Sequence, residues 1–211
     1  MNHFIITIAR KYGSGGRTIG KMLAEELGIA FYDRELLQLA SDDSGINESL
    51  FAQADEVAKS SPLFNIAKKV YTGQVIPPDR DDFISNENLF NYQAKIIKEL
   101  AAKESCVIVG RCADFILKDY PNVLKLYVHA PLEHCIETVT NLGICPHKQA
   151  KNYIQTIDKR RSAYYHYFTG QDWKDADHYD LCLNTANLSN VQCINLVKAY
   201  LQIQFGTTFN K

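Results

Sequence analysis

The chain has no long, uninterrupted apolar run. None of its apolar stretches approaches the ~18 residues of a membrane-spanning helix, and the N-terminus lacks the apolar core of a secretory signal. Net charge is nearly absent as well, because 23 Lys and Arg residues face 24 Asp and Glu residues. That balance argues against a nucleic-acid partner held by bulk electrostatics. We therefore expect a cytoplasmic protein with neither a membrane nor a nucleic-acid partner.

Paired cysteines are missing too. The six cysteines form no C-x-x-C pair, so the sequence offers no zinc-ribbon or redox motif. Cys106 and Cys182 lie in apolar, strand-like runs, which predicts reduced core residues. With 211 residues and 46% apolar content, the chain can bury the core of a single domain. The sequence indicates no oligomeric state.

What the chain does have is a glycine-rich segment between a predicted strand and a predicted helix. Residues 4–8 are β-branched and aromatic, as in a buried strand. From residue 19, apolar side chains recur three and four positions apart until Gly28, which predicts a helix that ends there. Between them lie Gly13, Ser14, Gly15 and Gly16. Backbone N–H groups of such a loop, together with the following helix N-terminus, suit a phosphate.

The phosphate-loop pattern G-x-x-x-x-G-K-[ST] is met in part. Gly16 and Thr18 occupy the last glycine and the hydroxyl position, so Thr18 would be a ligand of Mg²⁺. Lys11 replaces the first glycine, and Arg17 replaces the lysine. A guanidinium is always charged and binds two phosphate oxygens at once, so we expect Arg17 to do the work of the lysine. Lys11 is the competing candidate.

Two other interpretations of this loop are weaker. A Rossmann loop would use Gly13 and Gly15 with Asp33 about twenty residues on. However, Thr18 then stands at its third glycine, and four residues separate the strand from the first glycine. A tight connection that binds nothing is the other alternative, and the density of glycines beside a hydroxyl and a cation disfavours it.

Charged residues follow two further predicted strands. Asp33 and Arg34 come after the strand at 29–32, and Arg111 comes after the strand at 107–109. In an open parallel sheet these strand ends face the ligand crevice. Asp33 can therefore face a ligand or cap the helix predicted at 35–40, and both remain open. Arg111 can bind a substrate phosphate or lie on the surface.

The remaining pattern alternates strands and helices around one irregular segment. Residues 42–85 contain short predicted helices at 48–59 and 63–71 and a breaker run, which is typical of a functional or mobile insert. Further helices are predicted at 87–103 and from Pro131 to Gly143, and further strands at 123–129 and 180–184. Ser189 and Gln192 form a capping box for a last helix, whose apolar face would be Val191, Ile194, Val197 and Leu201. Five strands alternating with helices predict a doubly wound, mostly parallel α/β sheet.

A basic segment precedes the last strand. Asp158 is followed by Lys159, Arg160 and Arg161, and then by four aromatic residues within 164–168. An exposed charged helix or a single-strand nucleic-acid site would also combine these residue types. The glycine-rich loop favours a third interpretation, a basic lid that closes over phosphates.

These motifs together resemble the cytidylate kinase-like family of P-loop proteins, over roughly residues 4–200. The runs that carry the resemblance are Tyr12-Gly-Ser-Gly-Gly-Arg17, Phe31-Tyr-Asp-Arg-Glu-Leu-Leu37, Val107-Ile-Val-Gly-Arg-Cys-Ala-Asp114, Asp158-Lys-Arg-Arg161, Tyr167-Phe-Thr-Gly-Gln-Asp-Trp173 and Tyr179-Asp-Leu-Cys-Leu-Asn184. The resemblance implies a P-loop kinase-like domain over residues 1–211, with its core in 1–41, 86–144 and 174–211. It also implies a helical monophosphate-binding insert at about 42–85 and a basic lid at about 145–173.

The resemblance further implies ATP and Mg²⁺ as cofactors and phosphoryl transfer to CMP or dCMP. Residues that would hold the ATP phosphates and metal are Gly13, Ser14, Gly15, Gly16, Arg17 and Thr18. Arg111 matches the arginine of a Gly-Arg-Asp motif that faces the nucleotide substrate, and Asp33, Arg34 and Asp114 join it as acceptor-side candidates. Asp158 and Arg161 match the lid's Asp-x-x-Arg, so the catalytic candidates are Arg17, Asp158, Arg160 and Arg161.

Two departures fall where cytosine and its sugar would be recognised. Cys112 replaces the aspartate of Gly-Arg-Asp, and Asp33-Arg34-Glu35 replaces an Asp-Ser-Gly. The sequence thus predicts a kinase of a nucleoside monophosphate. A P-loop kinase for another small acceptor and a non-catalytic nucleotide-binding sensor are the alternatives.

Overall fold

The sheet has five strands, all of them parallel. The computed structural model describes residues 3–57 and 73–206. Its strands are β1 (Ile5–Arg10), β2 (Ala30–Tyr32), β3 (Cys106–Val109), β4 (Val123–His129) and β5 (Leu181–Asn184). They lie in the order β2-β3-β1-β4-β5, and each neighbouring pair is parallel. The predicted α/β sheet is confirmed.

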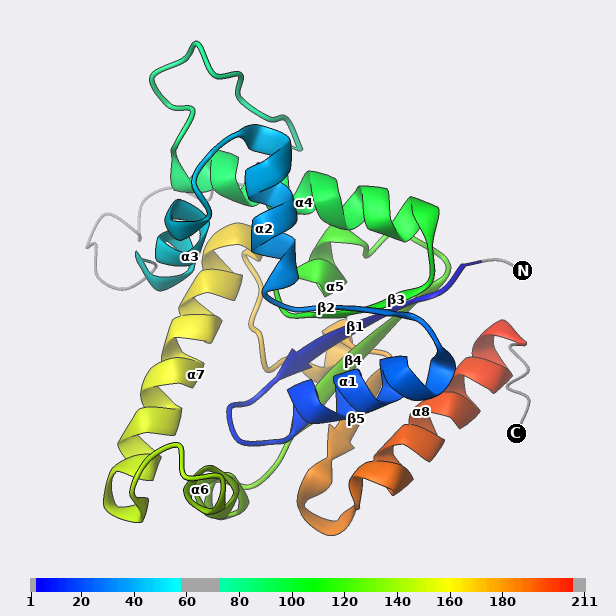
Figure 1. Cartoon of the computed structure of the whole chain (residues 1–211). Coiled ribbons are helices and arrows are strands. Elements are labelled where there is room, and N and C mark those ends of the chain that lie inside the picture. Colours follow the sequence, from blue (N-terminus) through cyan, green and yellow to red (C-terminus); the bar gives the residue numbers. More distant parts are fainter. Residues whose placement is uncertain (1–2, 58–72, 207–211) are drawn as a thin grey trace.

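Helices connect the strands and cover both faces of the sheet (Figure 1). They are α1 (Gly16–Leu27), α2 (Glu35–Ser44), α3 (Glu48–Val57), α4 (Asn86–Lys103), α5 (Ala113–Ile116), α6 (Leu132–Asn141), α7 (His147–Thr169) and α8 (Asn190–Phe205), with 3-10 turns η2 (Ala176–His178) and η3 (Thr185–Asn187). The helix predicted at 63–71 and the end of the one predicted at 48–59 lie outside the described residues. None of the described helices combines the length and apolarity needed to cross a membrane.

Side chains along β1 alternate between two apolar layers, one on each face of the sheet. Ile6 and Ile8 pack into the cluster formed with α1 and α8, whereas Ile5 belongs to the cluster formed with α2, α3 and α4. Successive side chains of a strand point to opposite faces, so a run of apolar residues is buried on both sides. β1 is therefore the centre of the fold, and its carboxyl end leads into the glycine-rich loop.

Helix ends mostly follow their sequence signals. Gly28 ends α1 in the left-handed conformation (φ 64°), and Ser189 and Gln192 form the predicted capping box. The predicted apolar face of α8 is wrong at Val191, which is 58% exposed while Ile194, Val197 and Leu201 are buried. Val191 lies in the first turn of α8, before the helix reaches the sheet.

The prediction that both strand cysteines are core residues is half wrong. Cys106 on β3 is fully buried, but Cys182 on β5 is exposed. β5 is an edge strand on which only Leu183, facing the α8 side, is buried. One face of this strand thus stays open.

The carboxyl ends of the strands point toward one region. The loop after β1, Asp33 after β2 and Gly110 after β3 follow three neighbouring strands of the sheet. Helix α7 stands beyond the carboxyl end of β1, on the left of Figure 1. Parallel strands thus bring together residues that are far apart in the chain.

Candidate active site

The glycine-rich loop is shaped by two left-handed glycines and one buried serine. Gly13 and Gly15 both have φ of 79°, and a side chain on Gly13 would meet the backbone oxygen of Cys135 at 2.8 Å. The Ser14 hydroxyl lies 2.9 Å from the carbonyl oxygen of Lys11 and 3.1 Å from that of Val128. Ser14 therefore fixes the loop from inside, and its side chain is turned away from any ligand.

Several backbone N–H groups of this loop are free. Those of Gly13, Gly15, Gly16, Arg17 and Thr18 donate to no group of the described chain, and the first helical bond of α1 comes from Ile19. Four N–H groups at a helix N-terminus have no partner within the helix and carry the positive end of its dipole. The loop can therefore receive an anion.

A cavity of about 790 Å³ opens at this loop. The predicted site residues that line it are Gly13, Gly15, Gly16, Arg17, Thr18, Asp33, Arg34, Arg111, Asp114, Arg160 and Arg161. Ser14 and Asp158 are not among its lining residues. The cavity thus joins the loop, the ends of β2 and β3, and α7 in one space.

Arginines dominate this cavity. Arg161 of α7 donates from its guanidinium to the backbone oxygen of Arg10 at 3.2 Å, and it lies 5.3 Å from the centre of the Tyr12 ring. Burial lowers the pKa of Arg10, Arg111 and Arg161. Neighbouring arginines lower the pKa of Arg10 and of Arg161 further. Cations held this close together favour an anionic ligand.

Asp33 is the counter-ion that these arginines share. Its carboxylate accepts a hydrogen bond from Arg17 Nε at 2.6 Å and lies 3.8 Å from an Arg10 guanidinium nitrogen. It also raises the pKa of Arg10, Arg111 and Arg161, in each case less than burial lowers it. Of its two open roles, capping α2 is excluded, because the N-cap residue of α2 is Arg34 and no side chain caps the helix. Asp33 faces the cavity.

Arg10 was missed by the sequence analysis. It is the last residue of β1, where the pattern shows only a strand end. Its side chain is 19% exposed and lines the cavity beside Arg161 and Asp33. The available signal was an arginine at the carboxyl end of the central strand, directly before the glycine-rich loop.

The turn after β3 is strained. Gly110, Arg111 and Cys112 have φ of 80°, 59° and 54°, so two residues other than glycine adopt the left-handed conformation in succession. Such outliers persist where surrounding structure holds them and cluster at functional sites. Here the turn carries the Arg111 side chain into the cavity lining.

Asp114 lies beneath this turn and is buried. It accepts a hydrogen bond from the Tyr165 hydroxyl at 2.6 Å, which ties α5 to α7. Burial raises the pKa of Asp114, and the bond from Tyr165 partly opposes that rise. Its contact with Tyr165 gives it a clear role in holding α7 against α5.

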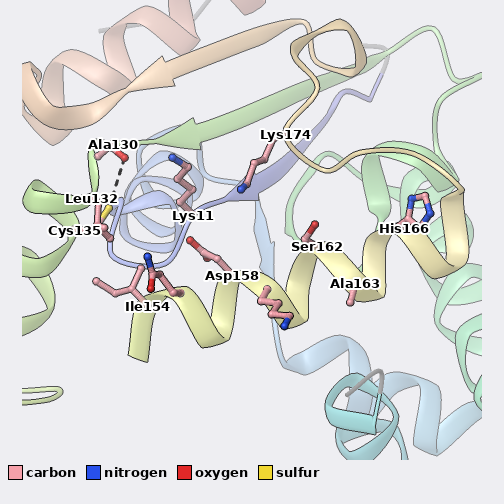
Figure 2. A pocket seen from close by; sticks show the side chains of 12 residues that line it. Lys11, Ala130, Leu132, Cys135, Ile154, Asp158, Ser162, Ala163, His166 and Lys174 are labelled. Carbon is pink, nitrogen blue, oxygen red and sulfur yellow. Dashed lines mark hydrogen bonds between the residues drawn. The ribbon is translucent and has the colours of Figure 1, made fainter. Parts of the chain in front are cut away.

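Asp158 joins α7 to the loop from the other side. Its carboxylate accepts the backbone N–H of Tyr12 at 2.8 Å and lies 3.8 Å from Arg161. It lines a second cavity of about 600 Å³, toward which Lys11 and Lys174 also extend (Figure 2). Asp158 therefore positions the loop and Arg161, whereas Lys11 lines both cavities.

Magnesium would find one suitable oxygen in the cavity. The Thr18 hydroxyl is exposed there and bonds to no group of the described chain, and Asp33 supplies a carboxylate nearby. Mg²⁺ is usually held by one or two protein oxygens together with substrate phosphates and water. The residues present thus fit a metal that arrives with a nucleotide.

Comparisons with known proteins agree with this geometry. The profile of the cytidylate kinase-like family matches residues 5–187. The chain is 26% identical over 204 residues to a cytidylate kinase of Methanopyrus kandleri, covering 92% of this chain and 91% of that protein. It is 24% identical to a cytidylate kinase of Saccharolobus islandicus, covering 94% and 91%.

Solved structures give the same result for the fold. An uncharacterised protein of Eubacterium ventriosum superposes with a TM-score of 0.69 at 26% identity, covering 95% of this chain and 99% of that one. A shikimate kinase of Bacteroides thetaiotaomicron superposes with a TM-score of 0.51 at 15% identity, covering 97% and 99%, so the likeness is one of fold. The match over most of its length shows that the chain belongs to the cytidylate kinase-like family.

Proposed function

We propose that this protein transfers the γ-phosphoryl group of ATP to a small acceptor, most favourably a nucleoside monophosphate of the CMP or dCMP type. The observation that carries the proposal is the cavity in which free loop N–H groups face Arg10, Arg111 and Arg161. Membership of a kinase family supports the same chemistry, and relatives named cytidylate kinase support a nucleotide acceptor.

The loop is the proposed ATP side. N–H groups from Gly13 to Thr18 would bind phosphate oxygens, and the Thr18 hydroxyl would hold the metal. Bound Mg²⁺ would neutralise part of the phosphate charge. The chain's own contribution is to orient the phosphates through a loop that Ser14 and Asp158 hold in place.

The ends of β2 and β3 are the proposed acceptor side. Arg111 would bind the acceptor phosphate, with Arg34, Asp33 and Asp114 as its neighbours in the cavity lining. Cys112, where the family motif has an aspartate, is buried and contributes no charge there. Acceptor choice therefore rests on a different set of contacts from those implied by a Gly-Arg-Asp motif.

Helix α7 would supply the transition-state charge. Arg161, and Arg160 beside it, line the cavity from α7, within the proposed lid of residues 145–173. Cations aimed at the equatorial oxygens of the transferring group stabilise the charge of the transition state. The substrate-binding insert expected at about 42–85 lies partly outside the described residues.

The proposal is tested by measuring ADP formation with saturating ATP and Mg²⁺ across a panel of acceptors. The panel should contain CMP, dCMP, the other nucleoside monophosphates, shikimate and simple alcohols. Acceptor-dependent ADP that is largest with CMP or dCMP supports the proposal. ATP binding without ADP under any condition would indicate a nucleotide sensor instead, and a faster non-nucleotide acceptor would reassign the substrate.

A further inference from the structure

Two glycines of the site are shaped around the side chain of Arg10. A Cβ atom on Gly16 would lie 2.7 Å from the Arg10 Cβ, closer than two side-chain carbons approach. A Cβ atom on Gly110 would overlap the Arg10 guanidinium. The stem of Arg10 therefore fills the space above Gly16, and its head fills the space above Gly110.

This arrangement changes how the loop aligns with the phosphate-loop pattern. Gly15, not Gly16, is the glycine that the backbone requires, because Gly15 has φ of 79° and α1 begins at Gly16. When Gly15 is taken as the last glycine of G-x-x-x-x-G-K-[ST], Arg10 stands at the first glycine, Gly16 at the lysine and Arg17 at the hydroxyl position. Thr18 then lies one residue beyond the pattern, and its candidacy as metal ligand rests on its exposure in the cavity and on its lack of a partner among the described residues. Compared with the pattern, the cation stands at position 10 and the glycine at position 16, and these two residues are in contact.

We propose, resting on the kinase function proposed above, that Arg10 is the phosphate-binding cation of this site and replaces the loop lysine. Arg10 is the last residue of β1, and its guanidinium lies above Gly110, where it lines the cavity next to Arg161. It binds the β- and γ-phosphates of ATP as a fork of N–H donors.

The two cations that the sequence suggested also line the larger cavity, but Arg17 is paired there and Lys11 reaches a second cavity as well. Arg17 donates to Asp33 at 2.6 Å, and its side chain is 60% exposed. Lys11 extends toward the cavity that contains Asp158 and Lys174 (Figure 2). Arg10 is the one of the three whose guanidinium lies against Gly110, at the end of β3.

The surroundings of Arg10 leave its charge under-compensated. Among the described residues, Asp33 is the carboxylate within ion-pair distance of Arg10, at 3.8 Å, and Arg17 binds that carboxylate more closely, whereas Asp158 raises the pKa of Arg10 less than Asp33 does. Burial, Arg161 and Arg111 lower the pKa of Arg10 to about 9, which leaves it a cation at neutral pH. A polyphosphate would supply the missing negative charge.

The test measures binding of inorganic tripolyphosphate and of ATP·Mg²⁺ by calorimetry, so it does not depend on turnover. Arg10→Met, Arg10→Lys, Arg17→Met and Lys11→Met are compared with the wild type, with thermal unfolding as the check that each variant is folded. A fifth variant is Arg10→Gly. A sixth, Arg10→Gly with Gly16→Lys, rebuilds the ordinary glycine and lysine in the space that Arg10 leaves.

We expect Arg10→Met to weaken both ligands at least tenfold, Arg17→Met and Lys11→Met to weaken them less than threefold, and the double variant to recover most of the loss over Arg10→Gly. Should Arg10→Met not fold, the comparison of the double variant with Arg10→Gly decides. The inference is overturned if folded Arg10→Met binds within threefold of wild type, if Arg17→Met or Lys11→Met binds more weakly than Arg10→Met, or if the double variant binds no better than Arg10→Gly. Failure of the kinase function would show differently, as wild-type binding without acceptor-dependent ADP.

Discussion

Replacing Arg161 by methionine should separate the chemical step from substrate binding. Methionine keeps an unbranched apolar stem in the helix and removes the guanidinium. In the structure that guanidinium donates to the Arg10 carbonyl at 3.2 Å and lies 3.8 Å from Asp158. Its proposed contribution is to the charge of the transition state, where losing one positioned donor costs about 2.7–4 kcal/mol, or about 10²- to 10³-fold in kcat.

Ground-state effects of this change should be smaller. The pair with Asp158 is partly exposed and long, so its loss costs at most about 1 kcal/mol. The contact with the Tyr12 ring contributes about 0.5–1 kcal/mol. ATP affinity should therefore fall by less than roughly tenfold while kcat falls by more.

Steady-state kinetics with saturating ATP·Mg²⁺ and varied CMP measure both quantities. Lys151→Met is the matched control, because Lys151 is exposed on the same helix and lines neither cavity. Wild-type kcat in a folded Arg161→Met protein would show that the basic segment of α7 is only a solvated helix face. An equal loss in kcat and in ATP affinity would assign Arg161 to ground-state binding.

Three further changes probe the same site. Asp33→Asn should lower the melting temperature, because the arginines lose their shared carboxylate. Tripolyphosphate should restore most of that loss in melting temperature. An Asp33→Asn protein that melts at the wild-type temperature would contradict this. Ser14→Ala should cost about 0.5–1.5 kcal/mol in denaturant unfolding, since the hydroxyl bond is lost while the carbonyls of Lys11 and Val128 keep the backbone N–H donors of Ser14 and Lys11; an unchanged unfolding free energy would contradict this. Burial raises the pKa of Asp114 above its ordinary value of 3.8, so the charged carboxylate destabilises the folded state. This destabilisation is absent below pH 3.8 and grows as the pH rises from there to the pKa of the folded state. Asp114→Asn should therefore be more stable than wild type at neutral pH, with a gain that fades in acid; a pH-independent difference would exclude the titration of Asp114 as its cause.

Strand ends were the most predictable part of the site. Apolar runs marked the strands, and parallel pairing then required Asp33 and Arg111 to follow adjacent strands at one edge of the sheet. The glycine-rich loop was equally visible, because left-handed backbone at Gly13 and Gly15 restricts the residue type. These features depend on local pattern and on topology, which the sequence carries directly.

What the sequence could not reveal depends on contacts between distant segments. The importance of Arg10 appears only when Gly16 and Gly110 are seen on either side of its side chain. The exposure of Cys182 likewise depends on the place of β5 at the edge of the sheet, which the strand pattern does not specify. A motif counted from Gly16 placed the loop cation at Arg17, because spacing alone cannot tell which glycine the backbone requires.

Phosphoryl transfer itself is tested most directly by following the γ-phosphoryl group. ATP carrying a radioactive γ-phosphorus is incubated with Mg²⁺, CMP and the protein, and the products are separated and counted. The account predicts that the label appears in CDP, in an amount equal to the ADP formed. The same incubation is repeated with dCMP and with every other nucleoside monophosphate. A nucleotide kinase is contradicted if, with all of them, the label stays in ATP or is found only in inorganic phosphate.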